Sequence, residues 1–158
     1  KEREWKHAWE PEMLEASHDL VFRNSFKDIR YALDTLNKTG TRYEFECYDT
    51  SHLYNLHYFW SEGLVEAPLF IQTCFGLLGG IGAHPEDVLQ MRRTADRLLG
   101  DNYHWSVLGA GASQLRIAAQ AAAISPALHS ARPLSSSGMT GQSRIRAKAF
   151  MQHTPWRR

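Results

Sequence analysis

Apolar residues recur along the chain with periods that switch between those of a helix and those of a strand. After Ser25 they are spaced three and four positions apart, which places them on one face of a helix. That stripe consists of Phe26, Ile29, Leu33 and Leu36. The run 42–48 is aromatic and alternating, as a strand is, and the run 69–75 is apolar at nearly every position, as in a parallel sheet covered on both faces.

Cap and turn residues mark the ends of these predicted elements. Ser25, with Asp28 three positions later, is typical of a helix N-terminus, and the run 49–51 offers caps for the next helix. Pro85, followed by two acids, opens a third helix. We expect glycines to end the helices, at Gly40, Gly63 and Gly100.

The predicted order is one helix followed by three strand–helix units, with strands at 42–48, 69–75 and 105–108 and the last helix at 113–123. Such alternation predicts an α/β fold with parallel strands and right-handed crossovers. The candidates are an open doubly wound sheet and part of a (β/α)8 TIM-type barrel. Three strands fill only a fraction of a barrel of roughly 250 residues. Periodicity alone leaves both candidates open.

The two ends of the chain lack this order. Residues 1–24 are predicted to be mostly loop, with a short strand near Leu20. Residues 1–123 hold 12 Lys and Arg against all 17 Asp and Glu, whereas residues 124–158 hold 6 Lys and Arg and no acid. We therefore expect two regions: a folded domain at 1–123, and a basic tail at 124–158 that is disordered or read out of frame. A solvated tail is favoured over a nucleic-acid contact.

Composition narrows the class of protein. Hydrophobic content of 43% and charged content of 22% are ordinary for a soluble domain, and no apolar run approaches the roughly 18 residues of a membrane span. The charged start has no signal-peptide pattern and no initiating Met, so we expect the chain to begin inside a longer one. Cys47 and Cys74 match no metal or disulfide spacing, which favours buried, reduced thiols and a cytoplasmic protein.

Four long blocks occur in one order: Tyr43–Leu56, Phe70–Gly82, His84–Leu99 and Trp105–Gly111. Over residues 16–123 they resemble the β-keto acid cleavage enzymes, whose best-known members act on 3-keto-5-aminohexanoate in lysine degradation. The resemblance implies a (β/α)8 barrel, a zinc ion and acetyl-CoA as co-substrate. It also implies a transferase reaction in which a β-keto acid is cleaved in retro-Claisen fashion, to acetoacetate and a new acyl-CoA.

The same resemblance implies which residues face the substrate. It places a carboxylate on the strand 43–48, which we assign as catalytic Glu46, with Glu44 as a second, substrate-binding candidate. Alternation points both side chains to one face, where an ionised carboxylate is costly unless it is paired. A structural ion pair with Arg42 or with a neighbouring strand is the alternative. Thr73, near the end of the next strand, is a weaker substrate-binding candidate.

Glycines follow the ends of two predicted strands. The amides of Gly79, Gly80, Gly109 and Gly111 are candidates for holding the CoA phosphates, because bare backbone N–H groups bind anions. Simple tight turns are the alternative, since neither loop contains Lys or Arg.

The chain departs from the family at its metal site. The zinc-binding histidines of the family would precede Lys1, and its Glu-containing block after the last helix is replaced from Ile124 onward. The remaining histidines, His52, His57, His84 and His104, are expected at the surface or in caps. We therefore predict no metal site in this chain and an inactive fragment. Self-association or a complementing chain is expected, and a non-enzymatic α/β binding or scaffold module is the alternative function.

Overall fold

The helices begin next to capping residues, as the sequence predicts. The computed structural model describes residues 5, 7–16, 18–21, 23–124 and 146–150. Ser25 caps α2 (Phe26–Asn37) in a capping box, in which its Oγ accepts a hydrogen bond from the Asp28 amide at 3.2 Å. Asp49 caps α3 (Thr50–Ser61), and His84 caps α4 (Pro85–Leu99).

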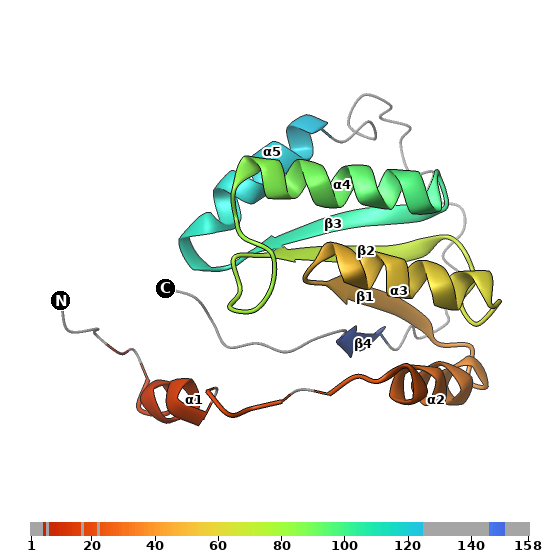
Figure 1. The fold of residues 1–158 in the computed structure, drawn as a ribbon, viewed down its shortest axis with the longest axis horizontal. Helices are drawn as coiled ribbons and strands as arrows, with labels where there is room; N and C mark the ends of the chain where they lie inside the picture. The colour runs from red at the N-terminus through yellow and green to blue at the C-terminus, as the bar shows by residue number, and fades with distance from the viewer. Residues whose placement is uncertain (1–4, 6, 17, 22, 125–145, 151–158) are drawn as a thin grey trace, which may run out of the picture.

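The strands form one sheet in the order β3-β2-β1-β4 (Figure 1). Its members are β1 (Arg42–Cys47), β2 (Leu69–Phe75), β3 (Tyr103–Gly109) and β4 (Arg146–Phe150). Each pair of neighbours is parallel. Three strands that alternate with helices therefore confirm the α/β prediction, and this is the arrangement of consecutive units of a TIM-type barrel.

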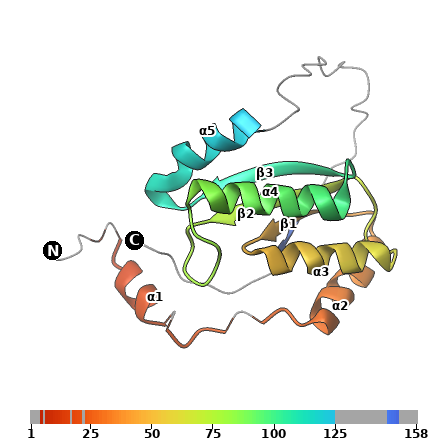
Figure 2. The ribbon, with the colours of Figure 1, turned by 45° about the horizontal axis from the view of Figure 1, so that its top comes forward.

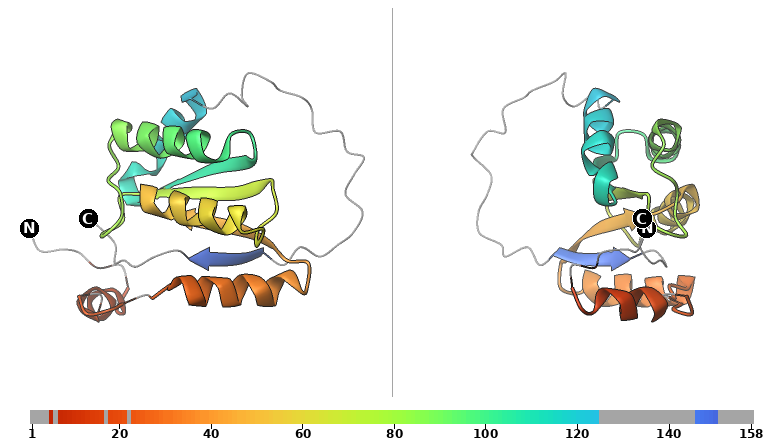
Figure 3. Two further views of the ribbon diagram at one scale, coloured as in Figure 1. Left: turned by 45° about the vertical axis from the view of Figure 1, so that its right-hand side comes forward. Right: turned by 90° about the vertical axis from the view of Figure 1, so that its left-hand side faces the viewer.

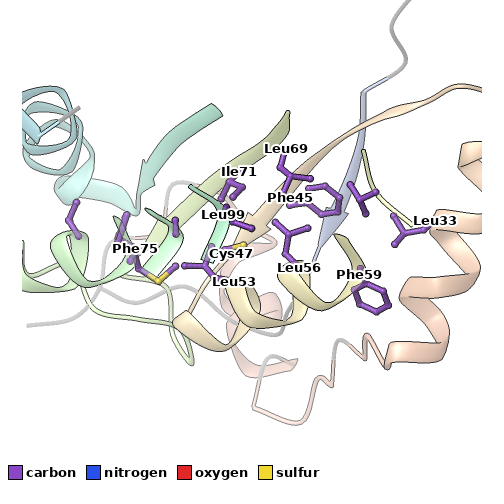
Figure 4. Close-up of a cluster of buried hydrophobic side chains, with 14 of the residues drawn as sticks. Leu33, Phe45, Cys47, Leu53, Leu56, Phe59, Leu69, Ile71, Phe75 and Leu99 are labelled. Atoms are coloured by element: carbon purple, nitrogen blue, oxygen red, sulfur yellow. The ribbon is translucent and has the colours of Figure 1, made fainter. Parts of the chain in front are cut away.

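One face of the sheet is covered by helices. Helices α3 and α4 lie side by side against it, and α5 (Gln114–Ile124), which follows the short 3-10 turn Gly111–Ser113, packs near β3 (Figures 2 and 3). The core lies between these layers (Figure 4). Its largest fully buried side chains include Phe45, Phe59, Phe75, Leu53, Leu56, Ile71, Met91 and Leu99. Burial of such side chains is the main stabilising term of the fold.

The ends of the chain differ from the prediction. Glu10–Ala16 forms a helix, α1, where a loop was expected, and Leu20 and Val21 form no strand. Residues 146–150 of the predicted basic tail form β4, whereas 125–145 and 151–158 lie outside the described residues. No sequence pattern indicated β4. The edge of a parallel sheet offers unpaired backbone groups, and a strand of almost any composition can form hydrogen bonds with them. The domain boundary at 123 stays a prediction.

None of the helices in the described part of the chain has the length and apolar character of a membrane span.

Candidate active site

Polar side chains cross the sheet on the face that the helices leave open. In β1, Phe45 and Cys47 belong to the core under the helices, so Glu44 and Glu46 point to the opposite face, as predicted. Glu46 is paired in register with Gln72 of β2, and Gln72 with Ser106 of β3. A polar row therefore runs across three strands on the helix-free face.

Glu46 is held by the residue that follows the strand. Its side chain is only 3% exposed, and its Oε2 accepts a hydrogen bond from the Tyr48 hydroxyl at 2.5 Å. Burial, together with this hydrogen bond to Glu46, raises the pKa of the Tyr48 phenol, so Tyr48 remains a proton donor at neutral pH. Arg42, the alternative ionic partner, instead lies 3.7 Å from Glu66 at the other end of β1.

Tyr48 is itself fixed through its backbone. Its amide donates to Nδ1 of His52 at 2.9 Å, and its carbonyl accepts from the Ile81 amide at 2.7 Å. Gly80 lies so close that a Cβ there would stand 2.8 Å from the Tyr48 carbonyl oxygen. The turn after β2 and the first turn of α3 therefore meet at Tyr48.

His52 was expected at the surface or in a cap; it does not lie at the surface, but it bonds a backbone amide ahead of its helix as a capping side chain does. The residue is 3% exposed, and burial lowers the pKa of its imidazole. It is the third residue of α3 after the Asp49 cap. In a capping box a side chain at this position bonds the amide of the cap residue, and here the imidazole reaches one residue further back, to Tyr48. A His three positions after an Asp cap, directly behind a strand, was the available signal.

Thr73 lies on the other face of the sheet from Glu46. It is fully buried in register with Cys47, and its Oγ1 accepts a hydrogen bond from the Trp105 indole at 2.9 Å. The structure does not bring Thr73 together with Glu46. Its role in substrate binding stays a prediction.

The candidate glycines lie in the two loops that follow β2 and β3. Gly79 and Gly111 adopt positive φ angles of 82° and 53°, which L-residues rarely adopt. The Gly109 amide already donates to Oε1 of Gln114 at 2.7 Å, and a Cβ at Gly109 would stand 3.0 Å from the Gln114 backbone. These contacts support tight turns at the same strand ends as Tyr48. Binding of CoA phosphates by these loops stays a prediction.

The described residues do not fit a zinc ion. No group of three or more His, Cys, Asp or Glu side chains among them is arranged to hold a metal. His52 Nδ1 is engaged by Tyr48, and His84 Nδ1 by the Glu86 amide. Both cysteines are buried and unbridged, as expected, and burial raises the pKa of the Cys47 thiol.

The fold limits the classes of protein to compare. Consecutive parallel strand–helix units are the building blocks of TIM-type barrels, in which active sites lie at the carboxyl ends of the strands. The sequence model of the β-keto acid cleavage enzymes matches residues 6–125. The chain belongs to this family, as its sequence blocks indicate.

Two curated relatives place the chain within the family. It is 60% identical over 116 residues to a 3,5-dioxohexanoate:acetyl-CoA acetone transferase of Paraburkholderia graminis, a match that covers 73% of this chain and 37% of the relative. It is 34% identical over 70 residues to a 3-dehydrocarnitine:acetyl-CoA trimethylamine transferase of Rhizobium meliloti, covering 44% of this chain and 22% of the relative. The chain thus spans little more than a third of the first relative's length. Both relatives are named as acetyl-CoA-dependent transferases.

Proposed function

We propose that this chain contributes the Glu46 side of the active site of an acetyl-CoA-dependent β-keto acid cleavage enzyme. The observation that carries the proposal is the buried Glu46 carboxylate, which lies on the helix-free face and accepts a hydrogen bond from Tyr48. Burying a carboxylate costs on the order of several kcal/mol unless its charge is compensated, and the Tyr48 hydrogen bond offsets part of that cost. A role toward a ligand explains why it is there.

The substrate we propose is a β-keto acid with a hydrogen-bond donor at its far end. The amine of 3-keto-5-aminohexanoate, the substrate class the sequence blocks imply, is such a donor. The enol hydroxyl of 3,5-dioxohexanoate, for which the first relative is named, is another. Either would donate to the Glu46 carboxylate, which acts as the acceptor, and Glu44 on the same face adds negative charge. The 60% identity favours the dioxo acid.

The overall reaction would exchange acyl groups between the two substrates. The bond between the β-carbonyl carbon and the α-carbon of the keto acid breaks, the carbonyl side leaves as its CoA thioester, and the acetyl group joins the two-carbon fragment as acetoacetate. Glu46 would orient the keto acid for this cleavage. No step is assigned to zinc, because the described residues do not hold it. We propose that the ligands of the zinc site come from polypeptide outside this chain. The isolated chain then does not turn over substrate. We further propose that the protein works in the cytoplasm.

An assay of CoA thioesters tests this proposal. The purified chain is incubated with acetyl-CoA and either 3,5-dioxohexanoate or 3-keto-5-aminohexanoate, with and without added zinc. In parallel, residues 6–125 replace the matched region of the Paraburkholderia graminis relative. We expect no product from the chain alone, and acetoacetate with a new thioester from the chimaera, faster with the dioxo acid. A stable, correctly folded chimaera without turnover on either substrate would contradict the proposal.

A further inference from the structure

Three segments of the chain meet at Tyr48, whose hydroxyl donates a hydrogen bond to the Glu46 carboxylate. Glu46 lies in β1, Tyr48 directly follows that strand, and Tyr48 is held in turn by α3 and by the loop after β2. We propose that Tyr48 is the positioning residue of Glu46, and that His52 together with the turn at Gly80 and Ile81 fixes Tyr48 for that task. This inference rests on the proposed role of Glu46 toward substrate.

The contacts leave the Tyr48 backbone little freedom. Its N–H is bound to His52 at 2.9 Å and its C=O to Ile81 at 2.7 Å, so both backbone polar groups are occupied. Its ring also meets the His52 ring edge-on, with centroids 6.3 Å apart. Tyr48 is 7% exposed. From this fixed backbone position the hydroxyl donates its hydrogen bond to Glu46.

The hydrogen bond from Tyr48 does two things for the carboxylate. A bond from a neutral donor to a buried anion offsets part of the cost of removing that anion from water, and it fixes the plane of the carboxylate. Tyr48 supplies this bond without a positive charge. An arginine or lysine at the same place would neutralise Glu46 and weaken its attraction for a donor on the substrate.

The role of His52 depends on which ring nitrogen carries the proton. Nδ1 accepts from the Tyr48 amide, so the neutral imidazole must carry its proton on Nε2. Asparagine can replace this acceptor, because its Oδ1 stands two bonds from Cβ, as Nδ1 does. Leucine has a comparable volume and no acceptor. His52→Asn and His52→Leu are therefore a matched pair that separates the hydrogen bond from packing.

The first experiment needs no ligand and uses the purified chain. Long-range proton–nitrogen spectra of the imidazoles, with His52 assigned by its loss in His52→Asn, are expected to show a protonated Nε2 and a bare Nδ1. The signal of the Tyr48 hydroxyl proton is assigned by its loss in Tyr48→Phe. We expect this proton to exchange slowly with water in the wild type and in His52→Asn, and rapidly in His52→Leu. Ile117→Val, a core change in α5, provides a destabilised control that keeps the signal. A proton on Nδ1, or equal loss of the signal in Ile117→Val, would overturn the inference.

The second experiment asks whether the positioning serves a ligand. 3,5-Dioxohexanoate, whose enol hydroxyl can donate to Glu46, is titrated into the chimaera and into chimaeras that carry the variants. We expect Tyr48→Phe and His52→Leu to weaken binding by about tenfold or more, and His52→Asn to restore it. Unchanged binding in Tyr48→Phe would overturn the positioning role while leaving the proposed function intact. If the chimaera without these substitutions does not bind 3,5-dioxohexanoate, the proposed function fails at this step, and the ligand-free spectra still decide whether His52 and Tyr48 hold Glu46.

Discussion

The indole Nε1 of Trp105 donates a hydrogen bond to Oγ1 of Thr73, 2.9 Å away. Thr73 is fully buried on the helix-facing side of β2, and Trp105 lies on the neighbouring strand, β3. The guanidinium of Arg92 stacks over the Trp105 ring at 4.9 Å. Thr73 therefore ties two strands together beneath α4, on the opposite side of the sheet from Glu46.

Replacing Thr73 by Val should lower the free energy of unfolding by about 1–3 kcal/mol, because the indole N–H loses its acceptor in a partly buried position. Thr73→Ser keeps the hydroxyl and should lose less. Urea unfolding followed by tryptophan fluorescence measures both variants. Equal stability of Thr73→Val and Thr73→Ser would show that the hydrogen bond contributes nothing.

Replacing Gly80 by Ala should displace the loop after β2. The new methyl group would stand 2.8 Å from the Tyr48 carbonyl oxygen and 3.2 Å from the Tyr48 Cβ, so the loop must move, at a cost of about 1–3 kcal/mol. The amide resonances of Tyr48 and His52 should shift. Gly63→Ala is the control, because nothing lies within 4 Å of its Cβ and only its positive φ of 74° is strained. If those resonances stay unchanged in Gly80→Ala, the close approach of Gly80 to Tyr48 is wrong.

Protonation of His52 should make the fold less stable in mild acid. Burial lowers the pKa of its imidazole from the ordinary value of 6.5, so the unfolded chain binds this proton more readily than the folded chain does. The contribution is present in full above about pH 6.5 and is lost as the pH falls below that value. Unfolding midpoints in urea at pH 7.5 and 5.5 should therefore fall further for the wild type than for His52→Asn. Identical falls would mean that His52 does not titrate with unfolding.

The helix-free face should promote self-association of the isolated chain. Phe70 is 46% exposed on that face, where its ring contacts His104 at 5.0 Å. Exposed apolar surface on an open sheet favours contact with another chain. Sedimentation velocity should show concentration-dependent association for the wild type and less for Phe70→Thr. Tyr31→Thr, at a 73% exposed position on α2, is the matched control and should behave as the wild type. Equal association of all three proteins would exclude this face as the contact.

The sequence predicted the central units because their signals are local. An alternating aromatic run defines β1 and an apolar run defines β2. Caps such as Ser25 and Asp49 act within a few residues of the helices that they start. The relation between Thr73 and Glu46 was not predictable in this way. Whether the two share a face depends on how β1 and β2 are paired, and a shift of one residue would reverse it.

The contacts around Tyr48 escaped prediction for a similar reason. His52 reaches Tyr48 within one helical turn, but Ile81 and Gly80 arrive from the loop after the next strand. Only the packed structure brings these segments together. The alternation that placed Glu44 and Glu46 on one face, in contrast, follows from strand geometry alone and is confirmed.

The most direct test of the account is the steady-state rate of the chimaera that carries residues 6–125, with Glu46→Gln and Glu44→Gln compared under saturating acetyl-CoA. Glu46→Gln has the same shape without the negative charge, and we expect it to lower kcat at least about a hundredfold with an unchanged melting temperature. Glu44→Gln should chiefly raise KM for the keto acid. A Glu46→Gln chimaera that keeps the wild-type kcat and KM would contradict the central claim that Glu46 faces the substrate.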